Sequence, residues 1–266
     1  MKFFIFCIIF FTQIFASEIF NGEVKVFQIP IEQAQDLRIN SKNISWIESP
    51  KNKNNVFTIL VAPYKSLRNS IILQNGNTKK IYKIIEKNYK KEEIQVNKKK
   101  VYPSKEAQIR IQNEFKEANK IYNKKIDGIY FDKKFIKPLN SVITSEFGNA
   151  RTFNGALKSF HSGSDFRAKI GTKILATNSG VVKLAKDRYI AGGSVIIDHG
   201  FGIFSQYYHL SEILVKVGDF VENGQVIAKS GQSGRVSGPH LHFGIIINGV
   251  QVNPLQFINE INQVLK

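Results

Sequence analysis

Cysteine is nearly absent from this chain of 266 residues, whose single cysteine is Cys7. Apart from Cys7 the chain can form neither disulfide bonds nor thiolate–metal bonds. Any metal site must therefore use histidine and carboxylate side chains. Long apolar runs are also absent. The run from Phe3 to Phe11 is well short of the roughly 20 residues that span a bilayer. We therefore expect no stable membrane span.

The N-terminus has the parts of a secretory signal peptide. Lys2 supplies the positive charge, the run from Phe3 to Phe11 supplies the apolar region, and Ala16 and Ser17 supply a small-residue exit. Cys7 lies inside the apolar region rather than at its end, which disfavours a lipoprotein attachment site. We predict a signal peptide over residues 1–16 and an exported protein, with a retained anchor as the alternative.

The chain is basic, with a formal net charge of +17, but its lysines are scattered. No compact arginine patch, zinc finger or base-stacking motif accompanies them, so we expect no nucleic-acid partner. An exported basic protein is equally suited to anionic polymers of the cell envelope. The hydrophobic fraction of 42% and charged fraction of 22% are those of a globular protein.

Short strand patterns separated by turn signals dominate both halves of the chain and predict a mainly β protein. The first half reads as a small β-sandwich-like domain, and its signals include the hairpin turn Asn75-Gly76-Asn77. The second half reads as an antiparallel β domain with almost no helix. The predicted organisation is a signal peptide (1–16), an N-terminal β domain (17–100), a helical linker (101–132), a C-terminal antiparallel β domain (133–258) and a C-terminal tail (259–266).

A helical period interrupts the strands. Ile111, Phe115, Ala118 and Tyr122 form one apolar stripe, and Ser104 is a plausible N-cap. We expect the helix to end at Asp127-Gly128 and to pack on one neighbouring domain. A coiled-coil partner helix is the less favoured alternative, because only about three turns are available.

The residues that carry chemistry gather in glycine-punctuated patches. His161 and Asp165 lie four residues apart around Gly163, and His240 and His242 would share one face of a strand. His209 lies between these patches in the sequence. Each piece alone is weak, but together they supply the three protein ligands that a catalytic zinc ion requires beside an open position.

These residues closely resemble the lysostaphin/LytM-type zinc metallopeptidases of bacterial peptidoglycan. The resemblance rests on the motifs His161-Ser162-Gly163-Ser164-Asp165, Tyr208-His209-Leu210 and Gly238-Pro239-His240-Leu241-His242-Phe243, and it covers roughly residues 138–257. It implies a periplasmic enzyme that binds Zn²⁺ and cleaves peptide stems or cross-links as a D,D-endopeptidase, with D,D-carboxypeptidase trimming as a further activity. It also allows an envelope protein partner for the N-terminal domain.

The resemblance assigns a role to each residue of the constellation. His161, Asp165 and His242 match the zinc ligands, and His209 and His240 match catalytic histidines. The alternative is a scaffold of the same fold that binds peptidoglycan or activates amidases, and the complete ligand set argues against it.

Further residues near these motifs have separate interpretations. Arg151 and Asn154 are candidates to contact a substrate carboxylate. His199 falls outside every motif and is assigned a structural role. Either Tyr207 or Tyr208 is expected to border the cleft, and the sequence does not choose between them.

Overall fold

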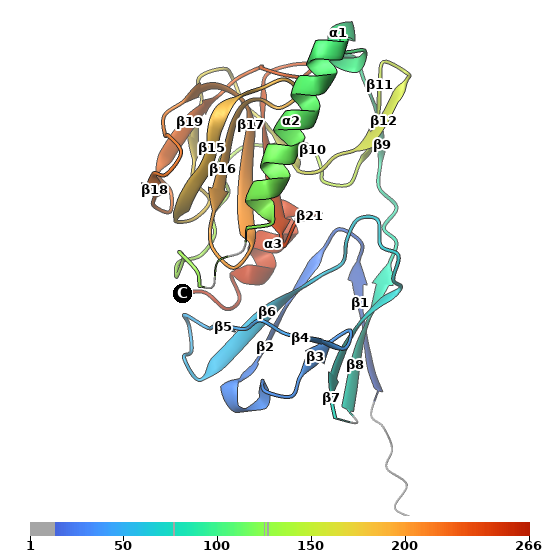
Figure 1. The fold of residues 1–266 in the computed structure, drawn as a ribbon, viewed down its shortest axis with the longest axis vertical. Coiled ribbons are helices and arrows are strands. Elements are labelled where there is room, and N and C mark those ends of the chain that lie inside the picture. The colour runs from blue at the N-terminus through green and yellow to red at the C-terminus, as the bar shows by residue number, and fades with distance from the viewer. Residues whose placement is uncertain (1–13, 77, 125, 127) are drawn as a thin grey trace, which may run out of the picture.

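The structure is a computed structural model and describes residues 14–76, 78–124, 126 and 128–266. Figure 1 shows a smaller N-terminal β part, a larger C-terminal β part and helix α2 (Lys105–Tyr122) lying beside the larger one. The mainly β fold predicted from the sequence is confirmed. Most of the predicted signal peptide lies outside the described residues, and its last residues open strand β1 (Ile14–Phe20). Among the described residues, no helix is both long enough and apolar enough to cross a bilayer.

The N-terminal part is built from two packed sheets, of strand order β1-β8-β7-β3-β4 and β2-β6-β5. Its core includes the buried side chains of Ile19, Leu60, Leu73 and Tyr82. The predicted hairpin after Leu73 is confirmed as the β7–β8 pair. The elements are β2 (Val24–Pro30), the 3-10 helix η1 (Ile31–Gln33), β3 (Arg38–Ile39), β4 (Lys42–Asn43), β5 (Ile47–Glu48), β6 (Asn55–Val61), β7 (Ser70–Asn75) and β8 (Thr78–Ile85).

Strand β9 (Lys91–Ile94) connects this part to the region of the histidine motifs. It pairs in parallel with β11 (Ala150–Phe153), which forms a hairpin with β12 (Leu157–Phe160). The stretch before the first histidine motif is thus a three-stranded sheet, and one of its strands comes from the segment that the sequence pattern assigns to the N-terminal domain.

Helix α2 follows the short helix α1 (Lys98–Val101). Ser104 is its N-cap, as predicted, and its side-chain oxygen accepts a hydrogen bond from the backbone N–H of Ala107. The predicted end at Asp127-Gly128 is wrong, because the helix ends at Tyr122 with Asn123 as its C-cap.

The apolar face of α2 is shorter than its sequence stripe. Ala118 and Tyr122 are buried against Leu184 and Phe204 of the large sheet, which confirms packing on one neighbouring part. Phe115, at 63% exposure, does not take part in that contact.

The C-terminal part is organised by a ten-stranded sheet whose main path runs β10-β13-β20-β17-β16-β15-β18. Residues 259–266, expected to be a tail, include the end of helix α3 (Pro254–Ile261) and the buried side chains of Val264 and Leu265. The strands are β10 (Ile143–Ser145), β13 (Ser164–Arg167), β14 (Lys173–Leu175), β15 (Gly180–Arg188), β16 (Gly192–Asp198), β17 (Ile203–Ile213), β18 (Phe220–Val221), β19 (Val226–Ser230), β20 (His240–Ile247) and β21 (Val250–Val252).

Candidate metal centre

Three adjacent strands of the large sheet place the site. In their register Asp165 of β13 lies directly opposite His242 of β20, and His242 lies opposite Tyr208 of β17. Directly paired residues project to the same face of a sheet, so these side chains form one row. His240 is two residues from His242 on β20 and projects to that face as well.

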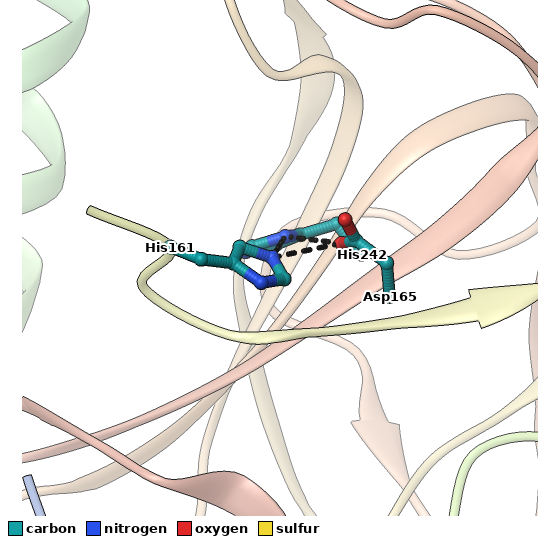
Figure 2. A group of neighbouring side chains, drawn as sticks. All are labelled: His161, Asp165 and His242. Carbon is teal, nitrogen blue, oxygen red and sulfur yellow. Dashed lines mark hydrogen bonds and ion pairs between the residues drawn. The ribbon is translucent and has the colours of Figure 1, made fainter. Parts of the chain in front are cut away.

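His161 joins this row from the loop between β12 and β13 (Figure 2). Its Nε2 lies 2.9 Å from Asp165 Oδ1 and 3.0 Å from His242 Nδ1, and His242 Nδ1 lies 2.9 Å from the same carboxylate oxygen. The ligand atoms of the three buried residues lie within 4.8 Å of one another. The structure thus brings together all three residues predicted to bind the metal.

The protonation states of these side chains suit a metal ligand set. His161 Nδ1 lies 2.8 Å from the carbonyl oxygen of Glu146, so it donates its proton there and leaves Nε2 free to bind a cation. Burial lowers the pKa of His242 to about 4. Burial alone would raise the pKa of Asp165, but the facing His161 and His242 hold it well below its usual range. Near neutral pH the group therefore offers neutral His242 and a carboxylate, which are the ligating forms.

A second layer of polar residues surrounds Oδ2 of Asp165, the carboxylate oxygen that faces away from the two histidines. Arg151 Nη2 donates to Asp165 Oδ2 at 2.6 Å, and Arg151 Nε donates to Glu92 at 3.0 Å. Glu92 also accepts hydrogen bonds from Ser145 and Asn149, each as short as 2.7 Å. Arg151 therefore already has two carboxylate partners, and our expectation that it meets a substrate carboxylate is replaced by a role beside the ligand set.

Sequence reasoning missed Glu92 and Ser145. Ser145 Oγ lies between Glu92, Arg151 and His161, at 3.2 Å from His161 Nδ1. Glu92 comes from β9, and only the parallel pairing of β9 with β11 brings it to Arg151. No local sequence signal points to that pairing.

The two predicted catalytic histidines lie beside the ligand group. His240 Nε2 is 3.8 Å from Asp165 Oδ1, and the ring centroids of His209 and His240 are 4.8 Å apart. His209 has φ of +64° at a point where the register of β16 and β17 shifts, so a β-bulge aims its ring. Burial, followed by the proximity of His240 and His242, lowers the pKa of His209 well below its usual value.

The remaining candidates separate clearly. Tyr208 stacks on His242 at 5.4 Å with an interplanar angle of 5°, whereas Tyr207 is wholly buried in the core. Tyr208 is therefore the tyrosine at the site. The side-chain amide of Asn154 bonds to the backbone N–H and carbonyl oxygen of Val96, and its contact with a substrate carboxylate stays a prediction. His199 is fully buried and bonded to Ser179 and Ser205, in keeping with a structural role.

A cavity of about 610 Å³ opens beside the group of His161, Asp165 and His242. Its wall includes His209, His242 and Tyr208, the arginines Arg188 and Arg235, and Phe115 of helix α2. Tyr64 of the N-terminal part reaches its rim and stacks on Phe160 with ring centroids 4.1 Å apart. The ligand group thus faces a space large enough to admit a peptide segment.

Comparison with known proteins decides the family. The model of peptidase family M23 matches residues 159–254, a range that contains the three ligands, His209 and His240. The chain carries a peptidase family M23 domain. The lysostaphin/LytM-type resemblance inferred from the motifs is confirmed for this domain, which is a metallopeptidase domain. Peptidases of family M23 are zinc enzymes, and the group of His161, Asp165 and His242 could hold that metal.

Individual relatives extend the match to different degrees. Peptidoglycan DD-endopeptidase ShyA of Vibrio cholerae is 45% identical over 96 residues, which is 36% of this chain and 22% of that protein. A metalloprotease of Buchnera aphidicola, described as uncharacterized, is 34% identical over 193 residues, 70% of this chain and 47% of that one. The chain therefore spans less than half the length of each of these two curated relatives.

A solved structure resembles more than the M23 domain. The crystal structure of a peptidase M23 from Pseudomonas aeruginosa has a TM-score of 0.68 and 25% identity, and the match covers 90% of this chain and 95% of that one. The shared fold thus includes the N-terminal β part and the segment with helix α2 as well as the M23 domain.

Proposed function

We propose that this protein is a zinc-dependent peptidoglycan hydrolase that cleaves peptide stems or cross-links in cell-wall remodelling. We assign it D,D-endopeptidase activity, with D,D-carboxypeptidase trimming as a second activity. The observation that carries the proposal is the convergence of His161, Asp165 and His242 within an M23 domain whose relatives include a peptidoglycan DD-endopeptidase. The proposal places the protein in the periplasm, with its N-terminal domain available to an envelope protein partner.

In this proposal His161, Asp165 and His242 are the zinc ligands. When bound, zinc supplies an acidified water and a Lewis acid for the scissile carbonyl. Arg151 holds Asp165 through its outer oxygen, which leaves Oδ1 directed at the two histidines. The stack of Tyr208 on His242 fixes the ring orientation of that ligand.

His240 is the proposed general base. Its Nδ1 donates to the carbonyl oxygen of Gly238 at 2.8 Å, so its Nε2 carries a lone pair. That nitrogen is 3.8 Å from Asp165 Oδ1 and lies at the ligand group. His240 is therefore placed to take the proton of the attacking water.

His209 is the proposed second catalytic histidine. Its Nδ1 donates to the carbonyl oxygen of Ser233 at 2.9 Å, so Nε2 of the neutral ring accepts rather than donates. Stabilising an oxyanion, the role that the family pattern implies, requires the protonated ring. The low pKa of His209 means that its resting ring is neutral. In this proposal the proton that the attacking water gives up to His240 is the one that His209 would need, and that proton leaves with the amine.

The alternative function is a non-catalytic scaffold that binds peptidoglycan or activates amidases. A scaffold of that kind does not need a complete ligand set. Here all three ligands converge and both histidines adjoin them, which favours the enzyme.

Digestion of purified sacculi tests the proposal. The full chain is incubated with sacculi and zinc, and a parallel sample receives a chelator. We expect cross-linked muropeptides to decrease only in the sample with zinc. Identical muropeptide profiles in both samples would contradict hydrolase activity and favour the scaffold.

A further inference from the structure

Arg188 and Arg235 line the cavity beside the proposed metal ligands. Arg151 is paired with Glu92 and Asp165, but among the described residues neither Arg188 nor Arg235 forms an ion pair. Arg235 lies over the ring of Phe153 at 4.2 Å. Within the part of the chain that the structure describes, the cavity thus holds two arginines outside any ion pair, and Glu114 is the carboxylate that lines it beside them.

Arg188 is the more unusual of the two. Its Nε and Nη1 atoms are excluded from solvent and have no hydrogen-bond partner among the described residues. The rest of its guanidinium interacts with the hydroxyl of Tyr208. The acidic residue that acts on it is Glu114, whose oxygens already accept from Arg110 and from the backbone N–H of Tyr189. Buried guanidinium donors without acceptors are costly for a folded protein, and an anion entering the cavity would remove that cost.

The position of Arg188 relates it to the reaction centre. Its Cζ lies 5.4 Å from the ring centroid of Tyr208, and the ring of His242 lies 5.4 Å from the same centroid. Arg188 is therefore within about 11 Å of the ligand His242. A peptide in extended conformation covers that distance in about three residues at roughly 3.3–3.6 Å each.

We infer that Arg188 binds a carboxylate of the peptide substrate. This inference rests on the proposed function and adds the substrate class: a peptide with a free carboxylate within about three residues of the scissile bond. Two carboxylates of a stem peptide have this chemistry. One is the C-terminal α-carboxylate, and the other is the side-chain carboxylate of diaminopimelate. A planar guanidinium suits either one because it can donate two parallel hydrogen bonds.

Peptide binding to the full, zinc-loaded chain tests the inference. The probe is a stem pentapeptide ending in D-Ala–D-Ala whose scissile amide is replaced by a non-cleavable methylene-amine bond. Three forms are compared by calorimetry: the free acid, the C-terminal amide and the diaminopimelate side-chain amide. We expect one amide to bind the wild type at least about tenfold more weakly than the free acid. The form that loses affinity identifies the carboxylate.

Variants assign the effect to Arg188. Arg188→Gln should bind all three peptides with equal affinity, and Arg188→Lys should keep only part of the discrimination because it lacks the fork. Arg38→Gln, on β3 of the N-terminal part, is the control and should behave as wild type.

Three results would overturn the inference. They are equal binding of the free acid and both amides to the wild type, binding of none of the peptides, and full discrimination by Arg188→Gln. If Arg188→Gln does not fold, the wild-type amide series and Arg188→Lys still decide. Digestion of sacculi is scored separately, so discrimination without cleavage would contradict the hydrolase and leave the carboxylate site standing.

Discussion

Arg151 Nη2 donates a 2.6 Å hydrogen bond to Asp165 Oδ2, while Oδ1 of the same carboxylate faces His161 and His242. Arg151 is itself held by Glu92, which comes from a strand 57 or more residues earlier in the chain than its partners Asn149 and Arg151. The orientation of the proposed metal ligand thus depends on a residue outside the M23 domain match. This relationship leads to the first prediction.

Arg151→Lys should weaken zinc binding. A lysine cannot donate to Asp165 and Glu92 at once in the fork geometry, so the carboxylate gains freedom to rotate. Loss of such an outer-layer partner typically costs about 10–100-fold in metal affinity. Competition with a chromophoric chelator measures this, with Arg38→Lys as the control. An unchanged zinc dissociation constant would show that Asp165 needs no such support.

Gly163→Ala should displace His242. A Cβ atom at this position would lie 2.4 Å from the carbonyl oxygen of Phe243 and 2.7 Å from His242 Nε2. Such overpacking typically costs about 1–3 kcal/mol of stability, and here it also pushes a proposed ligand. We expect lower zinc affinity and a lower melting temperature. Gly238→Ala is the matched control, because a Cβ there meets nothing within 4 Å. Equal behaviour of the two variants would refute the steric argument.

His199 should make the protein less stable in mild acid. Burial lowers its pKa from 6.5 to about 4 in the folded state. Between these values the unfolded chain binds a proton that the folded chain does not, so the free energy of unfolding decreases as the pH falls. His199 should lower the free energy of unfolding by about 2 kcal/mol between pH 7 and pH 5. His199→Gln should lack that share of the loss, as urea unfolding at both pH values would reveal. Parallel pH profiles for variant and wild type would contradict the assignment.

The ligand group could be anticipated from the sequence because its geometry is local. Residues two apart on a strand share a face, so the spacing of His240 and His242 alone predicts that their rings lie together. His161 lies in a short loop of glycine and serine and Asp165 on the strand that follows it, and the motif order of a known family linked the two patches. The choice of Tyr208 over Tyr207 needed the register, because only the pairing of β17 with β20 shows which tyrosine faces His242.

The outer layer could not be anticipated because it depends on a long-range parallel pairing. Glu92 looked like one more charged residue in a polar stretch, and its use is set by β9 joining β11. The end of helix α2 was misplaced for a related reason. Asn123 caps it without the glycine or proline that usually marks a helix end, so the pattern pointed to the next Asp-Gly pair. The burial of Val264 and Leu265 likewise depends on tertiary packing that a short C-terminal segment does not reveal.

The different roles proposed for His240 and His242 on strand β20 give the most direct test. His242→Ala removes a proposed ligand, whereas His240→Ala removes a proposed base that lies 3.8 Å from Asp165. Zinc content per chain and release of muropeptides from sacculi are measured for both variants and the wild type. The account predicts that His242→Ala loses zinc and activity together, while His240→Ala keeps most of its zinc and loses most of its turnover. Equal loss of zinc in the two variants, or full activity in either one, would contradict it.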